Sequence, residues 1–267
     1  MLIKWKKINM KKKLIIIISI LLLVTVILLG VINNYEPFHF TNNIFFKKQS
    51  MKSIYKEEYK NIDTIYVDVD DAIINIINGK SNDIKVEILS NRKNINLKSY
   101  NSKLSIVTDN NEECIFCTLN VINIEAPSNF KEYINVVNDY GHVNIESFPN
   151  STISVTNKFG NVSVDEAKVL KVISKRGSVD VKKVSDASIY SFWGTLNLDD
   201  VNSISSKSTL LYMNIDNVNK YINIKNDFGN INIKNATITR DSKIDVGFGN
   251  IDIENLKEDN AKLEKKN

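Results

Sequence analysis

Apolar and polar residues alternate in short runs along most of the chain after residue 60. The runs 65–69, 84–88, 104–106 and 122–124 place an apolar residue at every second position, and clusters of Gly, Asn and Asp separate them. Alternation with a period of two is typical of β-strands that bury one face, and Gly, Asn and Asp favour turns. The pattern therefore predicts an irregular β portion over residues 62–130.

From residue 131 to residue 256 the alternation becomes a repeat. Six of the nine glycines start the same phrase, and Leu211 fills the one missing place, so that the anchors lie 17 to 20 residues apart. Apolar residues recur two, four and seven positions after each anchor, and an alternating pair precedes it. In the last unit this preceding pair is displaced by two positions, to Ile244 and Val246. The glycine anchors are Gly141, Gly160, Gly177, Gly194, Gly229 and Gly249.

A unit of about 18 residues with two short strands cannot bury its own apolar face, whereas stacked copies cover one another. Glycine at each corner permits a positive φ angle without a steric cost. The sequence therefore predicts an all-β fold: a single-stranded β-solenoid (β-helix) of about seven regular turns over residues 131–256. We expect right-handed coiling, which is the usual hand of parallel β crossovers.

Three of the repeat units share the phrase Phe-Gly-Asn followed by alternating apolar residues, at 159–164, 228–233 and 248–253. These phrases, with the segment 104–127 that leads into the repeats, resemble the bacterial putative-adhesin family of β-strand-repeat proteins, a domain of unknown function. The resemblance covers about residues 62–256. It implies a β-solenoid on a membrane anchor, and it implies no established chemistry.

An apolar run over residues 14–32 precedes the β region. As a helix it would be about 28 Å long, close to the roughly 30 Å hydrocarbon core of a bilayer. A cleaved signal peptide is the alternative, but its apolar region is usually shorter, about 7–15 residues, and a small-x-small cleavage site would follow it. Residues 1–13 carry six lysines and no acid. The positive-inside rule therefore predicts an uncleaved signal anchor with a cytoplasmic N-terminus and an extracytoplasmic region 34–267.

The segments that flank the solenoid are expected to be simple. We interpret residues 33–61 as a stalk, with a short helix within 47–61 because Tyr55 and Tyr59 are four residues apart. Residues 257–267 are expected to form a polar tail. The formal net charge is +4, and the basic stub 1–13 accounts for the positive excess. The rest is nearly neutral, which removes the usual electrostatic basis for nucleic-acid binding.

The chain offers little that predicts catalysis or a cofactor. Cys114 and Cys117 are its only cysteines; a local disulfide and two packed thiols both remain open, while four zinc ligands or a redox motif on a helix are not indicated. Neither histidine lies near a nucleophile in the sequence. Asp199 and Asp216 would lie one turn apart and could share a cation, but we interpret them as solvated surface. We expect no metal, no cofactor and no enzymatic activity.

Two further columns follow the register of the anchors. The residue three positions before each anchor is Asn or Ser in most units, which we expect to bond to the corner backbone. The residue immediately before it is mostly aromatic. We interpret this second column as a structural stack that covers one corner, with an arginine lying over aromatic faces; a platform for sugar rings is the alternative. Its members are Tyr140, Phe159, Arg176, Trp193, Leu210, Phe228 and Phe248.

These features favour a binding or structural module at the cell envelope, similar to an adhesin. Its expected partners are the membrane, through the single-pass anchor, and an envelope polymer or a surface protein. The alternative is a non-enzymatic accessory or sensor of an envelope-stress regulatory system. Because the cytoplasmic stub has no room for a signalling domain, that role would require a second protein in the membrane.

Overall fold

The computed structural model describes residues 51–91, 94–108 and 120–266. Within these ranges all regular secondary structure is β-strand, which confirms the predicted all-β class. No helix among them is long and apolar enough to cross a membrane. The predicted transmembrane helix 14–32, Cys114 and Cys117 lie outside the described residues.

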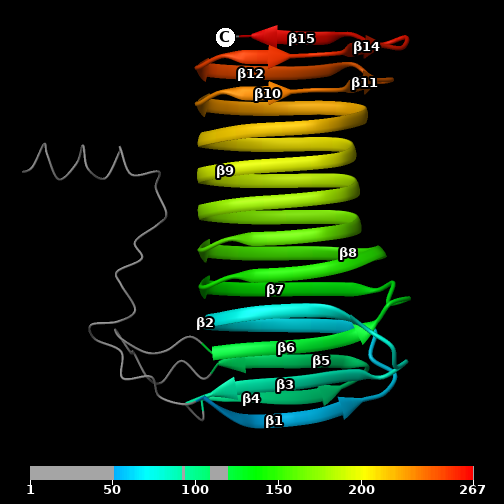
Figure 1. Cartoon of the computed structure of the whole chain (residues 1–267), viewed down its shortest axis with the longest axis vertical. Helices are drawn as coiled ribbons and strands as arrows, with labels where there is room; N and C mark the ends of the chain where they lie inside the picture. The colour runs from blue at the N-terminus through cyan, green and yellow to red at the C-terminus, as the bar shows by residue number, and fades with distance from the viewer. Residues whose placement is uncertain (1–50, 92–93, 109–119, 267) are drawn as a thin grey trace, which may run out of the picture. The chain divides into compact units, whose positions relative to one another are not determined.

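The repeat region forms a stack of parallel turns. Figure 1 shows the chain winding upward through β7, β8, β9 and the short strands above them. Parallel pairing joins residues one repeat apart, so that Val143 lies opposite Val162, and Ile231 lies between Met213 and Ile251. The strands of this part are β7 (Tyr133–Tyr140), β8 (Val143–Phe159), β9 (Val162–Phe228), β10 (Ile231–Ile233), β11 (Ala236–Ile238), β12 (Ser242–Phe248) and β13 (Ile251–Ile253).

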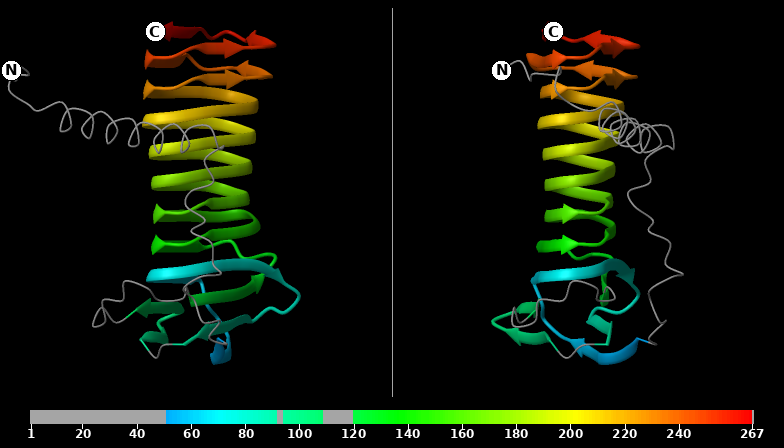
Figure 2. Two further views of the ribbon diagram at one scale, coloured as in Figure 1. Left: turned by 60° about the vertical axis from the view of Figure 1, so that its left-hand side comes forward. Right: turned by 90° about the vertical axis from the view of Figure 1, so that its left-hand side faces the viewer.

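Antiparallel strands close the lower end of this stack (Figure 2). β2 makes a first turn, pairing in parallel with β5 and β7 through its first half and with β6 and β8 through its second. β3 pairs antiparallel with β1 and β6, and β4 pairs antiparallel with β5. The strands are β1 (Lys52–Tyr59), β2 (Thr64–Gly79), β3 (Ile84–Ser90), β4 (Ile95–Tyr100), β5 (Lys103–Thr108) and β6 (Asn120–Pro127).

The core is a single cluster of the inward residues of successive turns. Val162, Val164 and Ile231 are fully or almost fully buried, as the period of two predicts. Phe148 is the largest of the fully buried side chains among the described residues, and it meets the ring of Phe130 edge-on at 6.4 Å. Each turn thus covers the apolar residues of the next, and the terminal turns depend on their caps.

Glycine is required at the six corners that it occupies because these corners pack closely against the backbone of the preceding turn, whereas Leu211 fills the remaining corner without a positive φ. Gly160 has a φ of 127°, a region that side chains rarely enter. A Cβ atom built there would lie 1.9 Å from the carbonyl oxygen of Gly141, one turn earlier. The equivalent atom at Gly177 would lie 2.1 Å from the carbonyl oxygen of Gly160. The regular spacing of glycines is therefore a steric requirement of stacking.

Two expectations about the flanking segments are wrong. The short helix expected within 47–61 is strand β1, because Lys52–Tyr59 pairs antiparallel with β3. The polar tail expected over 257–267 contributes β14 (Leu256–Glu258) and β15 (Leu263–Lys266), which extend the stack by pairing in parallel with β11 and β12. Both segments join the sheet through backbone hydrogen bonds, which any side chain except proline permits.

The displaced apolar pair of the last unit does not shift the register. Ile244 lies opposite Ile224, and Val246 lies opposite Asn226 of the buried polar column. Ser242 occupies the preceding inward position, where its hydroxyl accepts a hydrogen bond from the amide of Ile222 at 3.0 Å. The inward face of this turn thus has a serine where the previous turn has Ile222, and a valine where the previous turn has Asn226.

Candidate functional site

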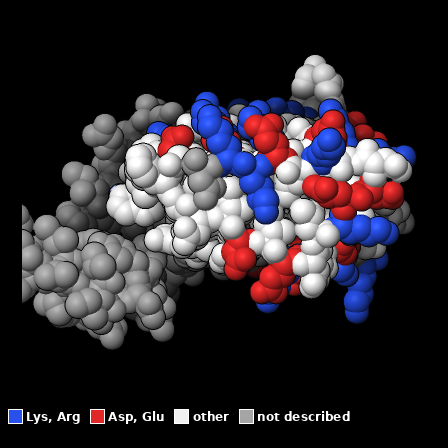
Figure 3. All heavy atoms as spheres, turned by 90° about the horizontal axis from the view of Figure 1, so that it is seen from above, with Lys and Arg blue, Asp and Glu red and all other residues white. Residues whose placement is uncertain are grey.

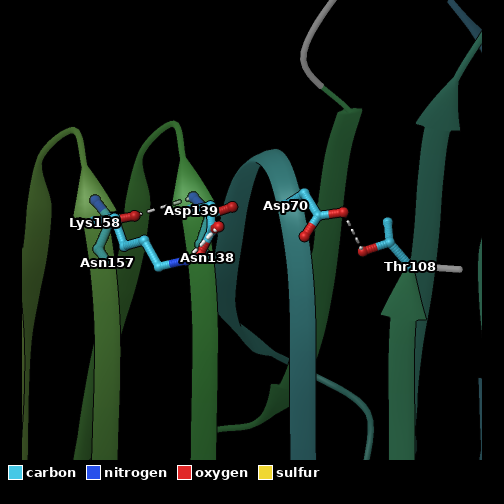
Figure 4. A network of polar contacts seen from close by, with 6 residues as sticks. All are labelled: Asp70, Thr108, Asn138, Asp139, Asn157 and Lys158. Atoms are coloured by element: carbon cyan, nitrogen blue, oxygen red, sulfur yellow. Dashed lines mark hydrogen bonds and ion pairs between the residues drawn. The ribbon is translucent and has the colours of Figure 1, made fainter. Parts of the chain in front are cut away.

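A buried column of Asn and Ser side chains lies beneath one corner of the stack. The amide of Asn138 donates to Oδ1 of Asn157 at 3.1 Å (Figure 4) and to the corner carbonyl one turn earlier, also at 3.1 Å. Asn157 and Asn226 donate in the same way to the carbonyl oxygens of Gly141, at 3.2 Å, and Leu211, at 2.9 Å. These bonds confirm the predicted role for the asparagines of the column, whereas the hydroxyls of Ser174 and Ser191, also in the column and among the described residues, make no hydrogen bond.

The residues immediately before the anchors form a stripe along this corner. Two pairs of rings in the stripe stack face to face. The rings of Tyr140 and Phe159 are 5.0 Å apart and inclined by 7°, and those of Phe228 and Phe248 are 5.2 Å apart and inclined by 9°. The parallel register makes each pair nearest neighbours on adjacent turns.

Arg176 and Trp193 continue the stripe between the two pairs. Arg176 lies opposite Phe159 in the register, and its guanidinium carbon is 4.5 Å from the centroid of a Trp193 ring. A guanidinium over an indole face is a favourable cation–π contact. Leu210 occupies the remaining place before Phe228.

The stripe is open to solvent along its length. The exposed fraction rises from 37% for Phe159 to 72% for Phe248, and it is 45% for Trp193. Large apolar side chains that are exposed in a contiguous row are typical of interaction surfaces. The stripe therefore stacks, as its structural interpretation requires, and also presents ring surface to a partner.

Three aromatic residues beside the stripe were missed by the sequence analysis. Tyr190, Phe192 and Tyr212 are exposed close to Trp193. The available signal was the alternation in Tyr190-Ser191-Phe192, where the buried serine implies that both aromatic residues point outward. We call the stripe together with these three residues the corner patch.

Charges around the corner patch are partly paired. Lys158 binds Asp139 at 2.5 Å (Figure 4), and this hydrogen bond raises the pKa of Lys158 above its ordinary value. Nearby, the hydroxyl of Thr108 donates to Asp70 at 3.4 Å. Seen from above, lysine and arginine are interspersed with aspartate and glutamate over the surface (Figure 3). Such a surface has no strong field of one sign, so charge acts through local groupings.

The face that follows the corner carries a different pattern. Asn232, Asn214 and Asn197 donate in series from one turn to the previous one, and the series ends on Asp180. A shallow groove of about 610 Å³ lies over these side chains. Asp199 and Asp216 line it as well, and each accepts a hydrogen bond from an asparagine of the next turn.

The described residues include no group of three or more His, Cys, Asp or Glu that could hold a metal ion. His142 accepts a hydrogen bond at Nδ1 from the backbone amide of Asn161, at 3.2 Å, and so takes part in the corner backbone. Cys114 and Cys117, the predicted disulfide candidates, lie outside the described residues, and their pairing stays a prediction.

The fold defines the class of this domain, and comparison with known proteins identifies its family. The stacked parallel turns and the glycine corners define a β-repeat domain. The model of the Toastrack DUF4097 family matches residues 62–266, and the chain belongs to this family. The family is a domain of unknown function.

Several solved structures are similar to this chain at low sequence identity. A protein of Parabacteroides distasonis named a putative lipid binding protein is 11% identical, with 82% of this chain and 97% of that chain covered and a TM-score of 0.50. A putative adhesin of Bacteroides fragilis is 15% identical over 82% and 97% of the two chains, with a TM-score of 0.39. A putative cell adhesion protein of Clostridium sporogenes is 13% identical over 81% and 100%, with a TM-score of 0.37. No curated protein matches the sequence.

Proposed function

We propose that this protein is a membrane-anchored, extracytoplasmic module that binds a partner at the cell envelope, in the manner of an adhesin and without catalysis. The exposed stripe carries this proposal. Its rings are held by stacking and by the buried amide column, so they are fixed before a partner arrives. A preorganised aromatic surface loses little side-chain entropy on binding.

The anchor and its orientation are supported by the sequence. Residues 14–32 are long and apolar enough to span a bilayer as a helix, and the lysines of residues 1–13 favour the cytoplasmic side. Protease added to intact spheroplasts should therefore digest the solenoid and leave a small N-terminal fragment in the membrane. A protected C-terminus, or a mature chain that starts after residue 33, would contradict the proposed topology.

Binding through the stripe is tested with the double variant Trp193→Ala/Phe228→Ala in the full chain on the cell surface. We expect the variant to fold, because both side chains are about half exposed, and to lose adhesion to cells or glycans. Tyr100→Ala is the matched control, since Tyr100 is 78% exposed and lies outside the corner patch. A folded double variant that adheres like the control would contradict the proposal. Loss of the cooperative melt would assign the stripe a structural role instead.

A further inference from the structure

A small hollow lies beside the corner patch, on the strand face that precedes the corner. It has a volume of about 220 Å³ and spans three successive turns. Lys171 lines it on one turn, Ser188 and Tyr190 on the next, and Ser205 and Lys207 on the third. Val172, Ile173 and Ile189 line it as well. Two lysines thus flank a floor of serine hydroxyls and aliphatic groups, with a phenol at one side.

The charges on the corner side of this hollow are basic, while Asp186, two residues before Ser188, is exposed farther from the corner. In the six residues before Gly177, Gly194 and Leu211, the charged side chains are all basic. Within the described part of the chain, no ion pair involves any of them. All are exposed, and the guanidinium of Arg176 lies against the ring of Trp193. These side chains are Lys171, Lys175, Arg176 and Lys207.

The face beyond the corner has the opposite character over the same turns. Asp180, Asp199 and Asp216 point outward there, and Lys182 is paired with Asp165 at 2.8 Å. A molecule with negative charges is therefore attracted to one side of the corner patch and repelled from the other. The corner separates a basic, aromatic face from an acidic, amide-lined face.

We propose that the hollow binds an acidic sugar unit of an anionic glycan that lies along the corner patch. This inference rests on the proposed binding function and names the ligand class of that surface. Lys171 and Lys207 pair with a carboxylate or phosphate on the glycan, and the hydroxyls of Ser188 and Ser205 bond to sugar hydroxyls. The aromatic rings of Tyr190 and Trp193 pack against the apolar faces of neighbouring sugars.

A glycan fits this surface better than a lipid bilayer does. A protein that binds a bilayer interface buries protruding apolar side chains below the lipid headgroups and places lysine or arginine at the level of the headgroups. Here lysines flank a hollow of mixed polar and apolar lining beside the aromatic surface, and the exposed rings of Tyr190, Phe192 and Trp193 keep about half of their area covered. A hydroxylated ring with an acidic substituent uses both the hydroxyl floor and the flanking lysines.

The test is binding of defined oligomers to the full chain in detergent micelles, measured by calorimetry. The probes are oligogalacturonate, which carries carboxylates, oligo(glycerol phosphate), which carries phosphates, and a neutral maltodextrin of similar length. We expect oligogalacturonate to bind at least 10-fold more tightly than the maltodextrin, with an affinity that falls as salt is added. Oligo(glycerol phosphate) has no sugar ring, and equally tight binding of it would overturn the sugar ring as part of the ligand. Lys171→Gln/Lys207→Gln should remove the preference for oligogalacturonate over maltodextrin. Lys220→Gln/Lys234→Gln, which changes two exposed lysines away from the hollow, should keep it.

The outcomes separate this inference from the proposed function. Equal affinity for neutral and anionic probes, lost in Trp193→Ala/Phe228→Ala, would overturn the anionic preference and leave the binding stripe intact. Equal losses in the two lysine pairs would overturn the hollow as the site. Binding of phosphatidylglycerol vesicles without binding of any oligomer would overturn the glycan. The binding function of the stripe itself fails if the folded Trp193→Ala/Phe228→Ala variant still adheres.

Discussion

Substitution of a corner glycine tests the stacking of the solenoid most directly. In Gly160→Ala the new methyl group would lie 1.9 Å from the carbonyl oxygen of Gly141. Relief of this overlap requires roughly a 1 Å movement of backbone in a close-packed stack. The φ of 127° is itself unfavourable for alanine. Strained backbone costs of order 1–3 kcal/mol, and the steric overlap adds a similar amount, so we expect a loss of about 3–5 kcal/mol.

The assay is urea unfolding of the full chain in detergent, followed by the circular dichroism of the β-sheet. With a slope of about 2–3 kcal/mol per molar urea, the loss corresponds to a midpoint lowered by roughly 1–2.5 M. Because each turn contacts only its neighbours, the two parts of the stack on either side of Gly160 could also unfold separately. A second transition would then accompany the shift.

Gly79→Ala is the matched control for this prediction. Gly79 is not among the glycines with positive φ, and its new methyl group would meet Cγ of Glu125 at 2.7 Å and the carbonyl oxygen of Ala126 at 3.2 Å, so its closest contact is with a side chain and not with backbone. Its effect should stay within about 1 kcal/mol, because alanine also lowers the entropy of the unfolded chain. Equal midpoints for Gly160→Ala and Gly79→Ala would refute the steric role of the corner glycines.

Three further predictions concern the core and one surface carboxylate. Ile231→Asp should unfold the adjoining turns, because it buries an unpaired carboxylate at a cost of several kcal/mol. Asn232→Ala, which removes one exposed hydrogen bond to Asn214, should cost no more than about 1 kcal/mol in the same titration, and equal effects would show an error in the inward register. Phe148→Ala should cost about 3–5 kcal/mol through lost burial, and a change below 1 kcal/mol would contradict its central packing. Hydrogen bonds from Ser147 and Lys183 lower the pKa of Glu166 below its ordinary value of 4.5. Its stabilising contribution is therefore complete above that pH and is lost as the pH falls through the lowered pKa. The stability difference between the wild type and Glu166→Gln should shrink on acidification, and a difference independent of pH would contradict this assignment.

The regular turns were predictable because one steric rule and one burial rule repeat in each of them. The spacing of Gly141, Gly160 and Gly177 reflects contacts between corner backbones, and the alternation around Val162 and Ile231 reflects burial. Both rules fix the type of residue at a given position of the repeat, and such a pattern is visible in the sequence. Sequence periodicity therefore reported the stack and its register directly.

The ends of the stack were not predictable in the same way. Tyr55 and Tyr59, four residues apart, fall on one face of a helix and equally on one face of a strand, and a register shift between Ser53 and Tyr55 interrupts the alternation of β1. In β15, Lys265 lies opposite Ile244 at a position that earlier turns fill with apolar side chains. Backbone pairing determines both strands, and side-chain patterns carry little trace of it.

For the candidate site, the sequence predicted which residues form the aromatic column, but it predicted neither their exposure nor the neighbouring hollow. The stripe follows from the register, but its exposure depends on how far each ring projects beyond the corner, and the hollow depends on three turns acting together. Lys171 and Lys207 are 36 positions apart in the sequence. Their proximity depends on the lengths of the two intervening turns, and no local motif contains both.

Because the turns stack in parallel register, the length of the domain can change without a change in its cross-section. Duplication or loss of one repeat would add or remove about 4.8 Å, the spacing of neighbouring strands, and would leave the other turns unchanged. Related chains can therefore act as molecular rulers whose reach is set by repeat number. Duplication of a turn within the corner patch would lengthen the aromatic row in the same step, so that evolution could adjust reach and valency together.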